Sequence, residues 1–365
     1  MAQDAASELI YPLMPLLIAG VVGAAPLALG IIEGFAEFIA GISKLYAGKF
    51  SDRFGRKRFV VGGYSAAVIG KAFVVFSFNW PGIFAGRVID RIGKGFRGAP
   101  RDALIHDGVE DKDLGKAFGF HRAGDNLGAV IGPLLALLLL SLTNEDVRTV
   151  AKWALIPAII SAIFTLLVRE VKAHERRSNF VKVPLSPKLK RTIGLLVIIQ
   201  LTNIPDALLL LRLHDIGFSA KGVVVGYALY MFVATLAAFP AGKIADRLHP
   251  KHVYLIGLIF FAIAYITLGL TKNHSVALIA LALYGFFPAL TDGVGKAWIG
   301  RLSSSEARGY SQGVFQASMS FAILAAGIWG GVFWSGGTTE IALIIAGIGA
   351  LFGALLISQY RSDAI

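Results

Sequence analysis

The chain has no cysteine and few charged residues. The missing cysteine excludes disulfides, thiolate metal ligands and cysteine nucleophiles. Only 16% of the 365 residues are charged, against roughly 25% in a soluble domain, and 56% are hydrophobic. The sequence also lacks a G-x-x-x-x-G-K-[ST] phosphate-binding loop and histidine-rich metal spacing. We therefore expect a membrane protein that is not an enzyme, uses no ATP and holds no metal or other cofactor.

Apolar windows without charge, such as 133–142 and 343–357, recur along the chain. Because one crossing takes about 20 apolar residues, the sequence predicts an all-α membrane protein with twelve transmembrane helices in two pseudo-symmetric six-helix halves. The polar segment with Pro184 and Pro187 predicts a linker at 172–191, between an N-terminal half (1–171) and a C-terminal half (192–365). The predicted spans are 6–22, 25–49, 58–77, 80–107, 116–141, 149–168, 192–212, 220–246, 252–271, 275–301, 309–335 and 338–359.

The two halves repeat each other at an offset of 194 positions. Residues 47–53 and 241–247 share five of seven identities. The same offset pairs four further small residues: Gly63 with Gly257, Gly115 with Gly309, Gly119 with Gly313 and Ala123 with Ala317. Two equivalent membrane halves are the usual construction of a secondary transporter.

The net charge of +12 comes largely from loops between spans. The positive-inside rule places both termini and the linker in the cytoplasm of a multi-pass protein of the inner (plasma) membrane. The same topology explains the basic loops better than nucleic-acid binding, which we do not expect.

Asp4 and Glu8 fall near the start of the first span, and little apolar sequence precedes them. That span begins either with a polar half-turn at the interface or, as we favour, with residues upstream of Met1.

The turn after the second span carries glycine, acidic and basic residues in the order Gly48, Asp52, Arg53, Gly55, Arg56 and Lys57. Glycine permits a tight turn and close helix approach. This stretch fits the G-x-x-x-D-R-x-G-R-K signature, so the chain resembles the major facilitator superfamily of transporters. In that family the signature's charged residues close the cytoplasmic side and an arginine pairs with an acid at the end of span 4. The resemblance implies that Asp107 is that acid.

The second copy keeps Gly242, Asp246 and Arg247, but His249-Pro250-Lys251 stand where the glycine and arginine would follow. Arg301 takes the place of Asp107 at the 194 offset. We therefore expect the complete lock only in the first half. The residues expected to act in gating are Gly48, Asp52, Arg53, Gly55, Arg56, Asp107, Asp246 and Arg247.

Two further stretches resemble family patterns. Gly128, Gly132 and Pro133 match the G-x-x-x-G-P core of the signature of proton-antiporting exporters, although Leu137 stands where that signature has glycine. Ordinary helix packing is the alternative reading of these small residues. Glu8 lies ahead of a tyrosine–proline pair, as an acid often does in the family's first span.

The fourth predicted span is the richest in charge. Arg87, Arg91, Lys94 and Arg101 share one helical stripe, with Asp90 near its edge. Charges at membrane depth cost at least a few kcal/mol unless paired or hydrated, so this face lies against protein or a water-filled cavity. It forms either a ligand site or a purely structural ion network. The predicted substrate-binding residues are Arg87, Arg91, Lys94, Arg122 and Asn126. The candidate proton-coupling acids are Glu8, Glu33, Glu37, Asp90, Asp125 and Asp206, of which we favour Glu33, Glu37 and Asp125.

These residues predict a monomeric, proton-driven exporter of a small organic molecule that works by alternating access, with substrate, protons and the lipid bilayer as partners. The span-depth bases of the first half outnumber its acids, which favours an anionic or zwitterionic substrate. Two alternatives stay open: a proton-coupled importer of a small organic anion, and a membrane receptor that binds a solute without moving it. In the second half, we expect most aromatic side chains, including Tyr227 and Tyr230, to pack or to face lipid.

Overall fold

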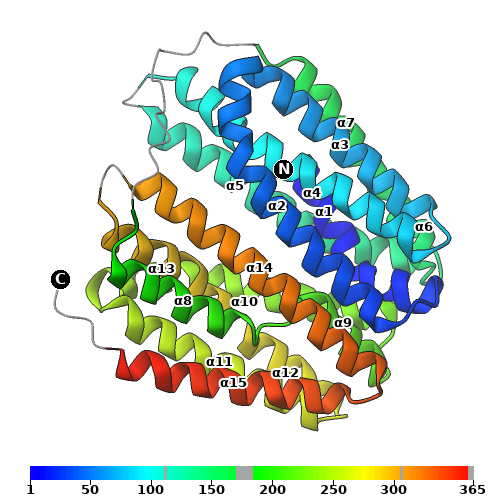
Figure 1. Ribbon diagram of the computed structural model, residues 1–365. Helices are drawn as coiled ribbons and strands as arrows, with labels where there is room; N and C mark the ends of the chain where they lie inside the picture. The colour runs from blue at the N-terminus through cyan, green and yellow to red at the C-terminus, as the bar shows by residue number, and fades with distance from the viewer. Residues whose placement is uncertain (111–112, 170–183, 305–306, 361–365) are drawn as a thin grey trace. The chain divides into compact units, whose positions relative to one another are not determined.

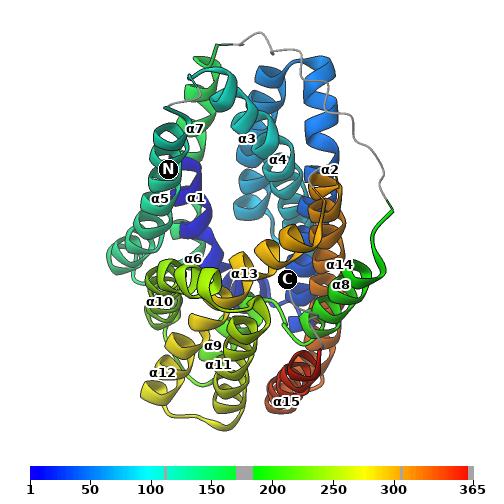
Figure 2. The same cartoon turned by 90° about the vertical axis from the view of Figure 1, so that its left-hand side faces the viewer.

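The computed structural model describes residues 1–110, 113–169, 184–304 and 307–360, apart from the side chains of Leu45, Gly48, Lys49, Asp52 and Asp246. The chain forms two compact units, Met1–Asn179 and Phe180–Ile365. Each described unit is built from helices (Figures 1 and 2).

The first unit contains long helices and one fragmented segment at its start. Its elements are α1 (Ala2–Ile10), the 3-10 turn η1 (Tyr11–Leu13), the π-helix η2 (Leu16–Val21), α2 (Pro26–Phe54), α3 (Arg56–Phe76), α4 (Trp80–Asp107), α5 (Leu114–Leu142), α6 (Val147–Trp153) and α7 (Leu155–Leu166). In this unit α4 packs against α2 and α3, α5 packs against α1, and α7 packs against α3.

The second unit also begins with a broken segment. Its elements are α8 (Pro187–Gln200), α9 (Asp206–Asp215), α10 (Ala220–Arg247), α11 (Pro250–Leu270), α12 (His274–Tyr284), α13 (Phe286–Leu302), α14 (Arg308–Ser335) and α15 (Thr339–Gln359). Here α11 packs against α13 and α15, α10 against α13, and α14 against α8.

Helix starts repeat at the 194 offset found in the sequence. The matching first residues are Pro26 and Ala220 for α2 and α10, Arg56 and Pro250 for α3 and α11, Trp80 and His274 for α4 and α12, and Leu114 and Arg308 for α5 and α14. The caps repeat as well. Asn79 accepts the Gly82 N–H at 2.9 Å to cap α4, and Asn273 accepts the Ser275 N–H at 2.9 Å to cap α12. The two halves therefore share local chemistry as well as length.

Glycine lets two helix pairs of the first unit approach closely. A Cβ at Gly70 of α3 would lie 2.5 Å from the carbonyl oxygen of Gly86 of α4. A Cβ at Gly132 of α5 would lie 2.7 Å from the carbonyl oxygen of Ala5 of α1. Such close approach is how membrane helices gain van der Waals contact without a hydrophobic driving force. Packing against α1 (Figure 2) thus accounts for the G-x-x-x-G pattern of α5.

The described part of the chain contains nine helical segments that are long and apolar enough to cross a membrane. The three predicted spans outside this set are 6–22, 80–107 and 192–212. The first is interrupted near Pro12 and Pro15, because proline removes a backbone donor and distorts the helix. The second is one continuous helix, α4, but it is too rich in charge to qualify. The third breaks between α8 and α9, just before Asp206.

The structure corrects one predicted boundary and shows an interruption inside two predicted spans, each of which remains one candidate crossing. The predicted linker ends too late, because α8 begins at Pro187; Ser186 accepts the Leu189 N–H at 3.2 Å, and proline is well tolerated in the first helical turn. Residues 172–183 of that linker lie outside the described residues. The predicted spans 149–168 and 275–301 are each two helices, α6–α7 and α12–α13, which meet near Ala154 and Gly285.

Candidate functional site

The turn between α2 and α3 places Arg56 beside the end of α4. Gly55 adopts a φ of 95°, a conformation that favours glycine, and so lets α3 begin immediately after α2 ends. Arg56 forms an ion pair with Asp107, the last residue of α4, and also donates to the carbonyl oxygen of Ala103 at 3.4 Å. Arg53 is exposed, with its guanidinium 5.3 Å from the ring centre of Phe54. The side chains of Gly48 and Asp52 lie outside the described residues.

The corresponding turn of the second unit uses different chemistry. His249 caps α11 by accepting the Lys251 N–H at 3.2 Å, and burial together with the positive charge of Lys251 lowers the pKa of the His249 imidazole. Arg301 donates to the carbonyl oxygen of Ala245 at 3.1 Å. Arg247 is exposed, and the side chain of Asp246 lies outside the described residues.

Three acids and three bases of α2, α3 and α4 meet inside the first unit. Their members, called here the α4 ion network, are Glu33, Glu37, Lys71, Arg87, Asp90 and Arg91. Arg87 pairs with Glu33, and Arg91 pairs with Glu37 at 3.2 Å. Both acids are one turn apart on α2 and both arginines one turn apart on α4, so the two ion pairs stack along the helices. Asp90 accepts from Lys71 of α3 at 2.8 Å and lies 3.9 Å from Arg87.

Most of the α4 ion network is buried, but Glu37 is not. The side chain of Glu37 is 39% exposed, whereas that of its partner Arg91 is 8% exposed. The network itself is balanced in charge. Lys94 and Arg97 lie beside it on α4 and give the region an excess of two positive charges.

Several donors of this region are not satisfied by the described chain. The Nε atoms of Arg87 and Arg91 and the Nη1 atom of Arg97 are buried without a hydrogen-bond acceptor among the described residues. Arg97 instead places its guanidinium 4.8 Å from the ring centre of Tyr64. Because an unsatisfied buried donor costs about 1–3 kcal/mol, we expect these atoms to find an acceptor from outside the described residues.

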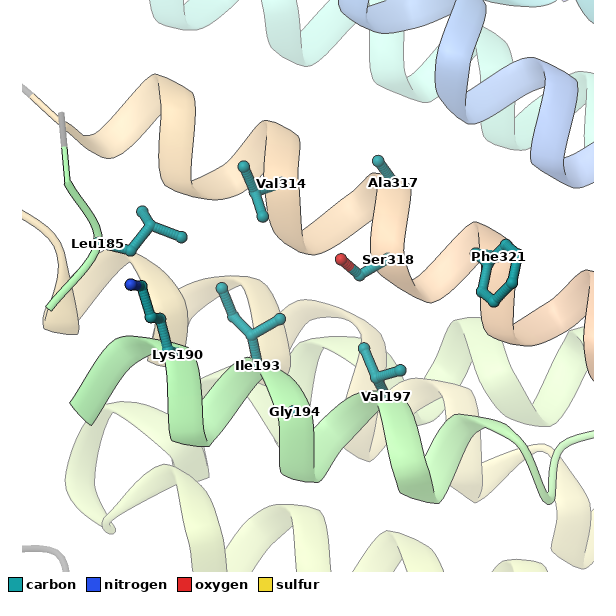
Figure 3. Close-up of a pocket in the computed structure, with 9 residues that line it drawn as sticks. All are labelled: Leu185, Lys190, Ile193, Gly194, Val197, Val314, Ala317, Ser318 and Phe321. Atoms are coloured by element: carbon teal, nitrogen blue, oxygen red, sulfur yellow. The ribbon is translucent and has the colours of Figure 1, made fainter. Parts of the chain in front are cut away.

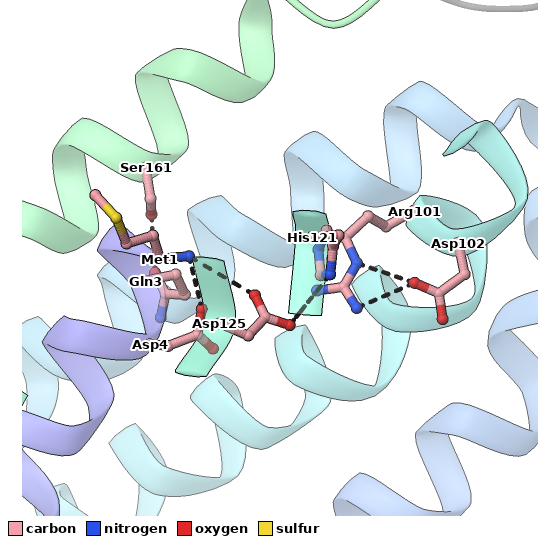
Figure 4. Close-up of polar contacts among 8 residues, drawn as sticks. All are labelled: Met1, Gln3, Asp4, Arg101, Asp102, His121, Asp125 and Ser161. Atoms are coloured by element: carbon pink, nitrogen blue, oxygen red, sulfur yellow. Dashed lines mark hydrogen bonds and ion pairs between the residues drawn. The ribbon is translucent and has the colours of Figure 1, made fainter. Parts of the chain in front are cut away.

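A second polar cluster joins α4 and α5 (Figure 4). Asp125 lies 3.3 Å from His121 and 3.9 Å from Arg101, and Arg101 pairs with Asp102 at 3.0 Å. The stripe predicted for α4 is thus divided, since Arg101 belongs to this cluster and not to the α4 ion network.

Besides Lys94, three residues predicted for binding or proton coupling in the first half lie outside these two clusters. Arg122 and Asn126 are exposed on α5 and take no part in the described ion pairs of the α4 ion network. Glu8 is half-buried on α1, next to Gly132, and interacts electrostatically with Lys94.

In the second unit, Asp206 is bound by tyrosine hydroxyl groups. Tyr284 and Tyr230 donate to the two carboxylate oxygens of Asp206 at 2.6 and 2.9 Å. Tyr265 donates to the side-chain oxygen of Asn203 at 3.2 Å. Asp206 is the first residue of α9, where the helix dipole favours negative charge. These five residues are called here the tyrosine–aspartate cluster.

Asp206 is among the acids predicted from the sequence, but its tyrosine partners are not, because most aromatic residues of the second half were expected to pack or to face lipid. The missed signal is the break before Asp206. Interrupted segments at corresponding positions of two repeats indicate a binding region, and η1–η2 and the α8–α9 break are such a pair.

Arg212 fastens the other end of α9. Its guanidinium donates to the carbonyl oxygens of Leu268 and Thr271 at 3.1 and 3.3 Å and pairs with Glu340 of α15 at 2.9 Å. Asp215 accepts from the indole of Trp334 at 3.0 Å. The C-terminal end of α9 is therefore fixed by these contacts, and its N-terminal end lies where the helical segment is interrupted after α8.

An open groove of about 520 Å³ runs between α8 and α14 of the second unit (Figure 3). Its lining is apolar except for Lys190 near one end and Ser318. Because specific ligand sites need several convergent polar groups, this groove is a weaker candidate than the two polar clusters.

Comparison with known proteins agrees with the repeat. The family model described as the Major Facilitator Superfamily matches residues 1–203 and 192–363. An uncharacterized MFS-type transporter of Methanocaldococcus jannaschii is 30% identical over 97% of this chain and 91% of its own length. Multidrug resistance protein MdtH of Salmonella arizonae is 22% identical over 90% of this chain and 80% of its own.

A solved structure is similar over nearly the whole chain. The crystal structure of the nucleoside transporter NupG matches with a TM-score of 0.80 and 13% identity, covering 99% of this chain and 97% of that one. At this identity the likeness concerns the fold alone.

Proposed function

Because the chain belongs to the major facilitator superfamily and is a secondary transporter of that kind, we propose that it couples the movement of a small organic molecule to protons by alternating access. One observation carries the proposed coupling: Glu37 is the half-exposed acid of an otherwise buried ion network, and it pairs with Arg91 at 3.2 Å.

Glu37 meets the two requirements of a proton carrier better than its neighbours do. A carrier needs a side chain that protein does not enclose, and Glu37 is 39% exposed, while Glu33 is 3% exposed. Its protonation must also change the protein. Protonating Glu37 would leave Arg91 buried without its acid, and an unpaired buried charge costs about 3–5 kcal/mol, enough to favour another conformation. Asp125 is the second candidate carrier, since it is part-exposed and shares His121 and Arg101.

Export is the first candidate direction. The relative named as a multidrug resistance protein supports it. The G-x-x-x-G pattern of α5 adds no further support, because packing against α1 already explains it. In an exporter driven by antiport, substrate and proton exclude one another, so substrate binding should weaken as the pH falls.

Import of an organic anion is the second candidate, and the Glu37–Arg91 ion pair favours it. A proton on Glu37 releases Arg91, whose planar guanidinium suits a carboxylate or phosphate. Proton and anion would then bind together, which is symport, and anion binding should strengthen as the pH falls.

We also propose an orientation in the membrane and an oligomeric state. The positive-inside rule supports cytoplasmic termini and a plasma-membrane location. The Arg56–Asp107 pair then lies on the cytoplasmic side, where we assign it to gating. We propose a monomer.

The test is transport in proteoliposomes that hold the protein in known orientation, with a panel of anionic, zwitterionic and cationic compounds. We expect a pH gradient to drive net flux in wild type. Glu37→Gln should lose this drive but keep substrate exchange at equal pH. Asp113→Asn, a change at a half-exposed acid paired with Lys116, is the matched control and should behave as wild type.

The pH dependence of substrate binding to purified protein then separates the two directions. If a pH gradient still drives flux in Glu37→Gln, Glu37 is not the proton carrier. Binding without flux for every compound would instead indicate a receptor.

A further inference from the structure

Helix α6 presents two cations one turn apart, Arg148 near its start and Lys152 in its last turn, each beside an exposed phenylalanine. The Arg148 guanidinium lies 4.8 Å from the ring centre of Phe78, and the Lys152 ammonium 6.0 Å from that of Phe76. Phe78 is 84% exposed and Phe76 57% exposed. Aromatic rings beside basic side chains at the end of a span are typical of the boundary between hydrocarbon and headgroups.

The hydrogen-bonding capacity of Arg148 is only partly used by the described residues. Its Nε and Nη1 atoms are buried and have no hydrogen-bond acceptor among those residues. The nearby carboxylate of Asp146 already accepts the N–H groups of Arg148 and Thr149, each at 3.1 Å, and the Thr149 hydroxyl at 2.6 Å. Asp146 therefore serves the start of α6. It interacts with Lys152 only electrostatically, and neither Arg148 nor Lys152 forms an ion pair among the described residues.

Two apolar stripes lead away from these cations. On α3, Ile69, Phe73 and Phe76 are exposed at a spacing of four and three residues, and on α7 Ile156, Ile160 and Ile163 repeat that spacing. This spacing places each set on one helix face. The two helices pack against one another and lie side by side in Figure 1. The exposed stripes thus lie on two neighbouring helices next to a basic, aromatic end.

We propose that this surface binds one phospholipid, with the phosphodiester against Arg148 and Lys152 and the acyl chains along the α3 and α7 stripes. Charge complementarity and the join of apolar stripes to a basic end distinguish this occupant from a second protein. The site lies at the end of α3 opposite Arg56, which is the outer leaflet under the proposed orientation. It is separate from the α4 ion network and does not depend on the proposed transport.

The experiment is lipid titration of the purified protein in detergent by native mass spectrometry, with dioleoyl phosphatidylglycerol as the probe. Wild type should bind one lipid more tightly than the rest. Arg148→Gln/Lys152→Gln should weaken that binding by about 25-fold, because each basic residue near a headgroup contributes roughly fivefold. Arg148→Lys/Lys152→Arg keeps both charges and should bind nearly as wild type does.

Lys221→Gln/Lys272→Gln is the matched control, since it removes two positive charges at the corresponding end of the second unit. This control should keep the tight site, and equal loss in both double variants would reduce the effect to net charge and overturn the proposal. Dioleoylglycerol has the chains without phosphate, and glycerol phosphate has the phosphate without chains. Neither should compete, and full competition by glycerol phosphate would show a free-phosphate site instead. An unchanged affinity in the folded Gln/Gln variant would also overturn the proposal.

Discussion

In the first unit, acids of α2 and α4 are held by lysine and arginine, whereas in the second unit Asp206 is held by two tyrosine hydroxyl groups. The helices α10 and α12, which carry these two tyrosines, begin at positions that match the starts of α2 and α4, so these helices differ in their side chains and not in their place in the repeat. Asp146 and Glu340 show the same divergence at the 194 offset. Asp146 caps α6, while its counterpart pairs with Arg212.

The difference bears on how each half can change state. An ion pair can exchange partners, and it responds strongly to protonation of its acid, because a lone buried charge is costly. A carboxylate at a helix start is stabilised by the hydroxyl groups that donate to it and by the helix dipole, and the surrounding aromatic surface is available for packing or ligand contact. We therefore propose charge coupling in the first unit and a hydrogen-bonding, aromatic contact surface in the second.

The largest effect should follow from removing one partner of the buried Lys71–Asp90 pair. Lys71→Met leaves Asp90 with Arg87 at 3.9 Å, and losing one partner of a buried pair costs about 3–5 kcal/mol of unfolding free energy. Denaturant unfolding in detergent measures the loss. Replacing both partners, as in Lys71→Met/Asp90→Leu, should recover most of it. A single variant as stable as wild type would show that the pair is not desolvated.

A smaller loss is expected in the second unit. Tyr284→Phe removes a 2.6 Å hydrogen bond to Asp206, and a bond to a charged acceptor contributes about 1.5–3 kcal/mol. Tyr230→Phe should cost a similar amount, and the double variant should not be additive because both hydroxyl groups serve one carboxylate. Strict additivity in the same unfolding assay would contradict the shared site.

The α2–α3 turn of the first unit and the α10–α11 turn of the second should differ in how much they affect transport. Arg56→Ala and Asp107→Ala should each slow flux, with a coupling energy of about 1–2 kcal/mol between them, because they remove the same ion pair. Arg301 stands at the counterpart of Asp107 and donates to the carbonyl oxygen of Ala245. Because the complete lock is expected only in the first half, Arg301→Ala should slow flux less than Asp107→Ala does. A loss in Arg301→Ala equal to that in Asp107→Ala would mean that both turns close the protein.

The smallest effect concerns the cap of α6. Asp146→Ala should cost about 1 kcal/mol, and Asp146→Asn, which can still cap, less. Hydrogen bonds from Thr149 lower the pKa of Asp146, so its contribution is present above the unfolded value of about 3.9 and is lost as the pH falls through the lower folded value. The stability difference between wild type and Asp146→Ala, measured against pH, should shrink only in acid. A difference that shrinks near neutral pH would assign it to another group.

The sequence by itself determined the class of the protein and the repeat. Hydropathy and the 194 offset depend only on residue order, and they located long helices such as α3 and α11 to within a few residues. The periodicity of α4 also marked Arg87 and Arg91 as sharing one face, since helical spacing is local.

Tertiary structure alone decided which partners these residues have. Arg101 shares the predicted stripe with Arg91, yet it pairs with Asp102 and approaches Asp125, while Arg91 pairs with Glu37. The tyrosines that hold Asp206 come from α10 and from α12, which lie far apart in the chain. Spacing along one helix fixes direction around its axis, but a contact also needs the distance and rotation of a second helix. Those are set by packing, here by glycines such as Gly70 and Gly86 that bring two backbones together.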